Sequence, residues 1–331
     1  MIPPPGSPTT ITTVINLNNG WSWISLNVEA ASMRITDVLH PNNLDISLVN
    51  NDHVKDQYDF TSYYEGYGFF GQLTHFNTDV MFAVQLVGGL GATWTVTGQP
   101  AVLPKTVTLN RGWTYISCPY PTAMKISGST DYLPHGIPFQ NGDQVKSFTD
   151  FTDYYESYGW FGTLDELEPG IGYMLDTSAG GSAVYEPARR RQLQDKSLML
   201  DTTLSPKQPK GPLPAAWTIS AARFATTMTI TAVVSVGDVE QKAGALAAFV
   251  GSEVRGVQDT AMVPPFGPFA GRPIYSLVVR ADKAGETLSF KYFDGRAEIM
   301  LDKTLTYAVD GQEGNAIVPI ALSAPRPRLF G

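Results

Sequence analysis

The first half of the chain contains one sequence written twice, and this duplication constrains the fold more than any other feature. Residues 15–28 read INLNNGWSWISLNV and residues 107–120 read VTLNRGWTYISCPY, an offset of 92. Residues 52–73 read DHVKDQYDFTSYYEGYGFFGQL and residues 143–164 read DQVKSFTDFTDYYESYGWFGTL, an offset of 91. Identity this dense indicates two copies of one module of about 90 residues, which we name copy one and copy two.

Each copy has the pattern of short β-strands. The opening segments alternate apolar and polar residues, as in Trp21-Ser22-Trp23, and Asn19-Gly20 marks a turn. The shared segment Tyr-Tyr-Glu-x-Tyr-Gly-(Phe/Trp)-Phe-Gly has too many rings and glycines for a helix interior, and it predicts an aromatic corner between strands. Further strands are predicted at 81–86, 93–97 and 172–175, and short helical turns at 35–39 and 52–60.

The last third of the chain predicts a β-sandwich. Residues 227–233 alternate cleanly, and turn signals such as Gly237 and Gly251 separate several apolar runs, which is typical of a Greek-key sandwich. Arg189–Arg191 and several prolines between residues 187 and 215 indicate a linker. The predicted fold class is all-β, with two tandem repeat modules before the sandwich. The predicted segments are an N-terminal extension (1–12), module one (13–101), module two (102–187), a Pro-rich linker (188–215), the β-sandwich (216–324) and a tail (325–331).

Composition excludes several classes of function. Of 331 residues, 23 are basic and 31 are acidic, so the net charge is −8 and binding to nucleic acid or to an anionic membrane is disfavoured. Cys118 is the single cysteine, which excludes an intrachain disulfide and a cysteine-based zinc site. No apolar run approaches the length of a membrane span, and the N-terminal sequence has no visible signal peptide.

Catalytic motifs are not found in the sequence. Gly88-Gly89-Leu90-Gly91 lacks the context of a phosphate loop and predicts a hairpin turn. Copy two has Gln144 where copy one has His53, so the module is not organised around a catalytic histidine. No cofactor and no enzymatic activity are therefore expected. The remaining carboxylates that suit a glycoside hydrolase, the third hypothesis for function, occur in copy two only and are Asp165, Glu166 and Glu168.

A metal site is not expected, although one acidic cluster has ligands of the right type. Asp150, Asp153 and Glu156 carry the oxygen ligands that Ca²⁺ prefers. Copy one has Ser62 in place of Asp153, which favours a solvated acidic surface over a duplicated calcium site.

Aromatic residues are the prominent feature of the repeat. Exposed tyrosine and tryptophan rings suit contacts with sugars or proteins, whereas buried rings would form each module's core and the seam between the copies. The glycine-flanked rings Phe70, Trp160 and Phe161 are predicted to be core. The candidate ligand- or partner-binding residues are Tyr63, Tyr64, Tyr67, Tyr154, Tyr155, Tyr158 and Trp160.

The repeat resembles a module of large secreted or surface-associated proteins of marine microbes, including dinoflagellate algae and some bacteria. The resemblance rests on GWSWISLNV, on DHVKDQ followed by YYEGYGFFGQL, and on LEPGIGYML in copy two. Copy one departs at the closing strand, where Asp79, Met81 and Phe82 stand. The sandwich segments LAAFVGSEVRGV and GETLSFKYFD are similar to domains appended to such proteins. The resemblance implies an extracellular or cell-surface location and a structural or adhesive role.

The sequence therefore predicts a non-catalytic structural or adhesive protein. Its modules are expected to assemble into a fibre, matrix or surface layer through contacts with other copies of the chain or with other matrix proteins. Unpaired β edges are one route to such assembly. Carbohydrate binding through exposed aromatic rings is the alternative.

Overall fold

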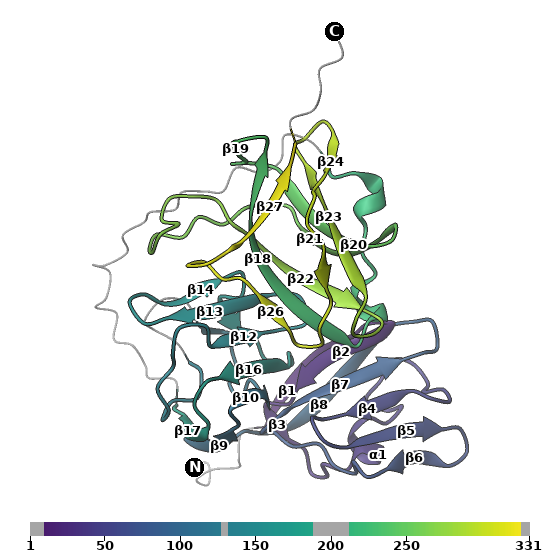
Figure 1. Cartoon of the computed structure of the whole chain (residues 1–331). Helices are drawn as coiled ribbons and strands as arrows, with labels where there is room; N and C mark the ends of the chain where they lie inside the picture. The colour runs from purple at the N-terminus through teal and green to yellow at the C-terminus, as the bar shows by residue number, and fades with distance from the viewer. Residues whose placement is uncertain (1–9, 127–131, 188–211, 326–331) are drawn as a thin grey trace, which may run out of the picture. The chain divides into compact units, whose positions relative to one another are not determined.

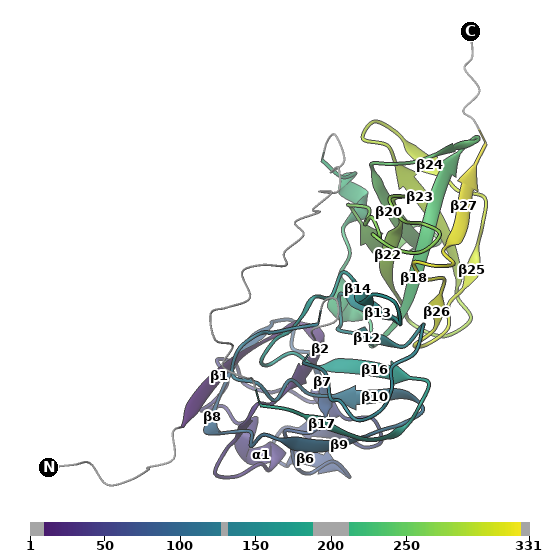
Figure 2. The ribbon, with the colours of Figure 1, turned by 90° about the vertical axis from the view of Figure 1, so that its left-hand side faces the viewer.

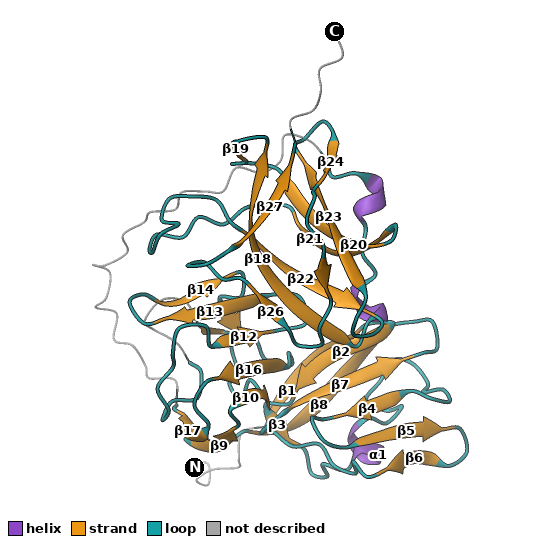
Figure 3. Cartoon of the chain, viewed as in Figure 1, coloured by secondary structure: helices purple, strands orange, loops and turns teal. Residues whose placement is uncertain are grey.

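A computed structural model describes residues 10–126, 132–187 and 212–325. Almost every element in these ranges is a β-strand, so the all-β prediction is confirmed (Figure 3). The chain divides into two compact units, one within residues 1–189 and one within residues 190–331, and each is described by itself. Arg189–Arg191, the predicted linker up to residue 211, and residues 326–331 of the tail lie outside the described residues.

Copy one forms two antiparallel sheets. The main sheet has the strand order β2-β7-β4-β5-β6, and the second sheet has the order β1-β8-β3 (Figure 1). Strand β1 begins two residues before the predicted start of the module, because Ile11 and Thr12 pair with Gly98 and Thr97 of β8. The elements of copy one are β1 (Ile11–Leu17), β2 (Gly20–Ser25), β3 (Val28–Glu29), α1 (Ile35–Val38), β4 (His53–Lys55), β5 (Phe60–Tyr64), β6 (Gly68–Gly71), β7 (Met81–Leu86) and β8 (Ala92–Pro100).

Copy two repeats the main sheet of copy one strand for strand, whereas its second sheet has two strands instead of three and β11 pairs with β15 separately. Its main sheet has the order β10-β16-β12-β13-β14, and β9 pairs with β17 as β1 pairs with β8. The β9–β17 pair lies next to β10 and β16 in both views (Figures 1 and 2). The strands of copy two are β9 (Lys105–Leu109), β10 (Gly112–Ile116), β11 (Met124–Lys125), β12 (Gln144–Lys146), β13 (Phe151–Tyr155), β14 (Gly159–Gly162), β15 (Glu166–Leu167), β16 (Tyr173–Thr177) and β17 (Gly181–Tyr185).

Each copy buries a core between its own two sheets. In copy one, Leu17 and Trp94 of the second sheet pack with Val54 and Phe82 of the main sheet. In copy two, Leu109 and Tyr185 pack with Val145 and Leu175. Each such large apolar side chain contributes about 1.5–3 kcal/mol when it is fully buried. The period-2 alternation in the sequence is therefore the pattern of strands with one face in the core.

Two local predictions are wrong. A helical turn forms at Ile35–Val38, but residues 52–60 form β4 and the start of β5 instead, because β4 pairs with a strand on each side and buries Val54. The glycines at 88–91 do not form a hairpin turn. They connect β7 to β8, which belong to different sheets, and Gly91 lies so close to β1 that a Cβ would sit 2.6 Å from the Leu17 carbonyl oxygen.

The second unit is a β-sandwich. One sheet has the order β19-β18-β22 and the other has the order β21-β20-β23-β24. Ile230 and Leu277 of the first sheet share a core with Leu246 and Phe290 of the second. The elements are η1 (Ala215–Trp217), η2 (Ala221–Arg223), β18 (Thr226–Val236), β19 (Val239–Glu240), β20 (Ala245–Val250), β21 (Glu253–Gln258), β22 (Tyr275–Ala281), β23 (Thr287–Phe293), β24 (Glu298–Met300), β25 (Leu305–Thr306), β26 (Gln312–Glu313) and β27 (Ile320–Ala324).

The sandwich is not purely antiparallel. Strands β26 and β27 both run parallel to β18, which differs from the expected Greek-key pattern of antiparallel neighbours. Each connection carries the chain back across the unit, because parallel partners cannot be joined by a tight hairpin. Within the described residues, no helix has the length and apolarity needed to cross a bilayer.

Candidate binding surfaces of the duplicated unit

Asp52 of copy one and its repeat equivalent Asp143 of copy two have a structural role. Asp52 is buried, and its carboxylate accepts hydrogen bonds from the backbone N–H groups of Val49 and Val87, both at 2.8 Å. Asp143 does the same for Gln140 (2.9 Å) and Ser178 (2.8 Å). These bonds satisfy loop N–H groups that would otherwise be buried without partners. This structural role is enough to explain why both copies have an aspartate here, and no catalytic role is needed.

Two repeated glycines are required by close backbone approach in the β5–β6 and β13–β14 hairpins. A Cβ at Gly71 would lie 2.3 Å from the Phe60 carbonyl oxygen, and one at Gly162 would lie 2.3 Å from that of Phe151. The aromatic corner predicted from the sequence is thus a hairpin whose strands are pressed together at these glycines.

The two copies are joined by a seam of reciprocal contacts. Ser25 Oγ donates to the Ile171 carbonyl oxygen of copy two (2.6 Å), and its repeat equivalent Ser117 donates to the Thr78 carbonyl oxygen of copy one (2.7 Å). Both serines are completely buried. The seam therefore has an approximate two-fold relationship, as expected where the same surface meets itself.

The turn after β4 and the turn after β12 each reach across this seam. Gln57 Nε2 donates to the Trp113 carbonyl oxygen (2.8 Å), and Gln57 Oε1 accepts from the Tyr115 N–H (3.0 Å). The carboxamide thereby pairs with the edge of β10 as a neighbouring strand would. Phe148 occupies the equivalent position in copy two and packs against the Trp23 ring, with 5.4 Å between ring centroids.

Cys118 lies beside the seam and is a core residue. It is fully buried, and its backbone N–H donates to Ser25 Oγ at 3.0 Å. Burial raises the pKa of its thiol to about 12. The thiolate is the reactive form, so this cysteine is not a nucleophile in the folded state.

The structure divides the seven aromatic candidates between core and surface. Tyr63 is half-buried against Phe69, and Tyr154 is half-buried against Trp160, with centroids 5.4 and 5.3 Å apart. Tyr155 and Trp160 are buried. The three that remain exposed are Tyr64 (41%), Tyr67 (92%) and Tyr158 (37%).

One expectation about the aromatic core is wrong. Phe70 is 79% exposed, although the sequence predicts it to be core. Alternation along β6 directs Phe69 toward Tyr63 and the core, so its neighbour Phe70 must lie on the opposite face. Trp160 is buried as predicted, whereas Phe161 is only half-buried.

An exposed aromatic surface results on copy one. It consists of Phe60 (57% exposed), Tyr64, Tyr67 and Phe70, all on the β5–β6 hairpin. We call these four residues the aromatic face. Strand β6 is the last strand of its sheet and pairs only with β5 among the described residues.

The three calcium candidates do not converge. Asp153 lies within β13, where it accepts from Gln144 Nε2 (2.7 Å) and from the Tyr155 hydroxyl (3.3 Å). Burial raises its pKa to about 7. Asp150 precedes the strand and accepts from the Thr149 hydroxyl, while Glu156 is exposed at the following turn. Within the described parts of the chain, no three His, Cys, Asp or Glu residues are grouped to hold a metal ion.

The carboxylates considered for glycoside hydrolysis have other surroundings. Glu166 forms an ion pair with Lys125 (2.9 Å), and Asp165 and Glu168 are exposed beside it in sequence. Two hollows lie along the seam between the copies, and none of these three carboxylates lines either of them. Their arrangement gives no support to the hydrolase hypothesis.

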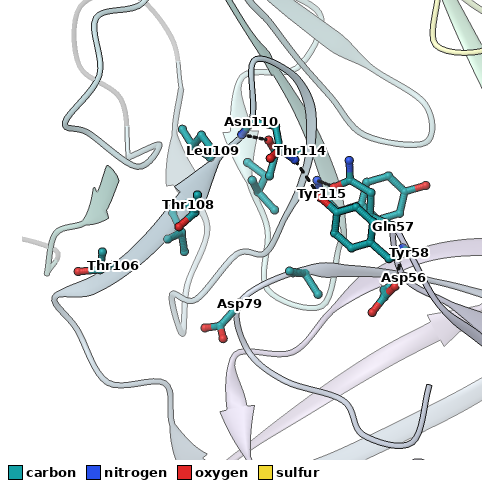
Figure 4. Close-up of a pocket in the computed structure, with 13 residues that line it drawn as sticks. Asp56, Gln57, Tyr58, Asp79, Thr106, Thr108, Leu109, Asn110, Thr114 and Tyr115 are labelled. Atoms are coloured by element: carbon teal, nitrogen blue, oxygen red, sulfur yellow. Dashed lines mark hydrogen bonds between the residues drawn. The ribbon is translucent and has the colours of Figure 1, made fainter. Parts of the chain in front are cut away.

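Two adjoining hollows lie along the seam. The larger has a volume of about 430 Å³ and the smaller about 360 Å³, and both are lined by Gln57, Tyr58 and Tyr115. We call the pair the seam groove. Figure 4 shows the larger hollow, with Gln57, Tyr58 and Tyr115 gathered at one end and Thr106 and Thr108 on a strand at the other.

Both copies contribute to the seam groove. Copy one supplies the turn Asp56–Tyr58 and Asp79, and copy two supplies Thr106–Leu109 of β9 and Thr114–Ile116 at the end of β10. Lys105 Nζ forms an ion pair with Asp79 at 2.6 Å. His53 lines the smaller hollow, and burial together with nearby Lys55 lowers its pKa, so it is neutral at pH 7.

Sequence reasoning missed this groove. The signal was the difference between the copies: Gln57 and Tyr58 stand where copy two has Phe148 and Thr149. A repeat search emphasises identities, and these positions are not identical.

No protein-family model matches the chain, and a search of curated proteins finds no match either.

Proposed function

We propose that the chain is a non-catalytic structural protein of an extracellular matrix, fibre or cell-surface layer, and that it self-associates through the aromatic face. The observation that carries the proposal is the exposure of four large rings on one hairpin of copy one. The extracellular setting rests on the resemblance of the repeat to modules of secreted proteins.

The size of the aromatic face supports an interaction. Phe60, Tyr64, Tyr67 and Phe70 together expose on the order of 500 Å² of aromatic side chain, which is the size of the largest apolar patch on a typical monomer, and such patches are often functional. Rings of this kind are enriched at the centres of protein interfaces and bring little conformational entropy cost.

A second copy of the chain is the partner that we propose. Strand β6 ends its sheet beside these rings, so its outer backbone edge and the aromatic face form one continuous surface. Two such edges can pair antiparallel around a two-fold axis, with the rings of both chains packed together. Aromatic packing suits partners that each carry a net charge of −8, because it needs no opposite charge.

Sedimentation velocity over a wide concentration range tests the proposal. We expect the wild-type chain to form dimers or larger species, and the double variant Tyr67→Ser/Phe70→Ser to remain monomeric. Leu90→Ser is the matched control, because Leu90 is 66% exposed in the same unit but lies outside the face. A wild-type chain that stays monomeric throughout, or a control that dissociates equally, would overturn self-association.

A further inference from the structure

The seam groove has the size and the position of a ligand site, and it borders the aromatic face at Phe60, which lines the smaller hollow. Its two hollows, of about 430 and 360 Å³, fall in the range of small-molecule sites. It is built on strands and on one short turn that crosses between the two copies. The groove exists only because the copies are paired, so it is a property of the duplicated unit.

The wall carries aromatic rings beside short polar side chains. Tyr58 is 78% exposed at the junction of the two hollows, and Tyr115 and Phe60 are also part of the lining. Thr106 and Thr108 present hydroxyl groups along β9. A flat ring can stack on the C–H face of a pyranose, while hydroxyl, amide and carboxylate groups match the sugar hydroxyls.

The groove is already held in place without a ligand. Asn110 Nδ2 donates to the Tyr58 hydroxyl at 3.1 Å, and the Asn110 backbone N–H donates to Thr114 Oγ1 at 2.8 Å. The two bonds of Gln57 to the edge of β10 fix the turn that carries Tyr58. A site held in this way loses little conformational entropy when it binds.

Charge argues for a neutral ligand. Three carboxylates, Asp56, Asp59 and Asp79, line the hollows, against one lysine, Lys55. Lys105, outside the lining, is in an ion pair with Asp79. A phosphate or an anionic polymer would therefore meet more negative than positive charge. The polar wall along β9 equally disfavours a purely apolar ligand.

We propose that the seam groove binds a neutral oligosaccharide of hexose or pentose units, with Tyr58 as the stacking platform. One site per chain follows, because copy two has Phe148 and Thr149 in place of Gln57 and Tyr58 and so lacks both the amide and the phenol.

An extended peptide is the rival occupant. The consecutive residues Thr106–Leu109 line the larger hollow, and β9 pairs only with β17 among the described strands, so a peptide could add to its free edge. Two features of the opposite wall argue against a peptide. The Gln57 carboxamide already occupies the facing edge of β10, and the rest of that wall offers side-chain rings and hydroxyl groups instead of a second strand edge.

Isothermal titration calorimetry of the full chain tests the proposal. The probes are cellohexaose, xylohexaose, mannohexaose and laminarihexaose, with hyaluronan as the anionic control and a threonine- and valine-rich peptide as the rival. We expect at least one neutral oligosaccharide to bind with a stoichiometry of one per chain. Failure of all four neutral probes, or binding of only the peptide or hyaluronan, would overturn the assignment.

Substitutions then locate the site. Tyr58→Ala should weaken oligosaccharide binding by about tenfold or more, whereas Tyr58→Phe should retain most of it because the ring remains. Tyr158→Ala is the control, since this exposed tyrosine of copy two lines neither hollow and lies outside the aromatic face. An equal loss in Tyr158→Ala would move the sugar site away from the groove. Oligosaccharide binding is measured by calorimetry and self-association by sedimentation, and Tyr58 is not one of the four residues of the aromatic face, so failure of one proposal leaves the other intact.

Discussion

The main sheets of the two copies have the same strand order, but one cross-strand pair consists of different residues in each copy. In copy one, His53 faces Ser62, and their side chains are 2.9 Å apart. In copy two, Gln144 faces Asp153 at the equivalent positions, and the bond is 2.7 Å. Both pairs are hydrogen-bonded, so the residues have changed together while the interaction has been kept.

The same comparison separates two kinds of residue. Asp52 and Asp143 perform the same backbone task in each copy, and Gly71 and Gly162 permit the same close approach. Of the positions that face the other copy, Gln57 and Phe148 have diverged, whereas Ser25 and Ser117 are identical and make reciprocal bonds. The lesson is that identity within the repeat marks contacts that both copies need, whereas divergence at Gln57 and Phe148 marks where each copy meets different surroundings.

The largest expected effect is the loss of stability when a side chain is added at Gly71 or Gly162. Gly71→Ala and Gly162→Ala should each lower the free energy of unfolding by about 3–5 kcal/mol, because the new Cβ collides with backbone across the hairpin. Chemical denaturation monitored by tryptophan fluorescence measures this. Gly66→Ala is the control: Gly66 has φ +81° but no atom near its Cβ, so a loss of about 1 kcal/mol is expected. Unequal losses at the two close-contact glycines would show that the copies are not equivalent here.

The next effect is the pH dependence that Asp153 gives to copy two. The pKa of Asp153 is raised by burial from 3.8 to about 7, so the folded state holds its proton more tightly than the unfolded state does. This stabilisation is complete below pH 4 and is lost as the pH rises through 7. Between pH 5 and pH 8 the wild type should lose about 2–3 kcal/mol that Asp153→Asn does not lose.

Urea denaturation of both proteins at a series of pH values measures this difference. Gln72→Ala in copy one is the control and should leave the pH profile unchanged, because Gln72 is an exposed residue that does not titrate. Parallel profiles for the wild type and Asp153→Asn would contradict the assignment.

A smaller effect concerns the seam. Gln57→Ala should lower the free energy of unfolding by about 1–2 kcal/mol, because it removes the two hydrogen bonds of the Gln57 carboxamide to the Tyr115 N–H and the Trp113 carbonyl oxygen. Native-state labelling of the Cys118 thiol should become faster, since this residue lies beside the seam and reacts only when the structure opens. Gln72→Ala, at an exposed position of the same copy, should change neither quantity.

The smallest effect on stability is expected at the aromatic face. Phe70→Ser should change the free energy of unfolding by less than about 0.5 kcal/mol, because the side chain is 79% exposed. Thermal unfolding at low protein concentration measures it. A large loss would mean that the ring supports the hairpin itself and is not reserved for a partner.

Much of the fold follows from local pattern. Alternation predicted the strand at 93–97, which lies within β8 and buries Trp94 and Val96, because one face of such a strand must enter the core. Residues 52–60 were mistaken for a helical turn because β4 is stabilised by neighbours distant in sequence, which no local window contains. The parallel pairing of β18 with β27 is likewise a long-range property.

The candidate surfaces were less predictable. Identical sequence letters at Tyr64 and Tyr155 gave no sign that the first is 41% exposed and the second 1%. The seam groove depends on the meeting of Asp56–Tyr58 with β9 and β10, and its walls come from segments about 50 residues apart. In the sequence, the groove is marked only by the difference between Gln57 and Phe148 at equivalent positions of the repeat. That difference can be interpreted only once the structure shows that both residues lie at the seam.

The buried serines of the seam affect whether the duplicated unit can be divided into single copies. Ser25 and Ser117 each find their acceptor in the other copy, and Trp23 is shielded by Phe148. A single copy expressed alone would expose the Trp23 indole or lose the serine's partner across the seam, so we expect it to be less stable than the pair. The two copies are thus better described as one folding unit than as two separate domains.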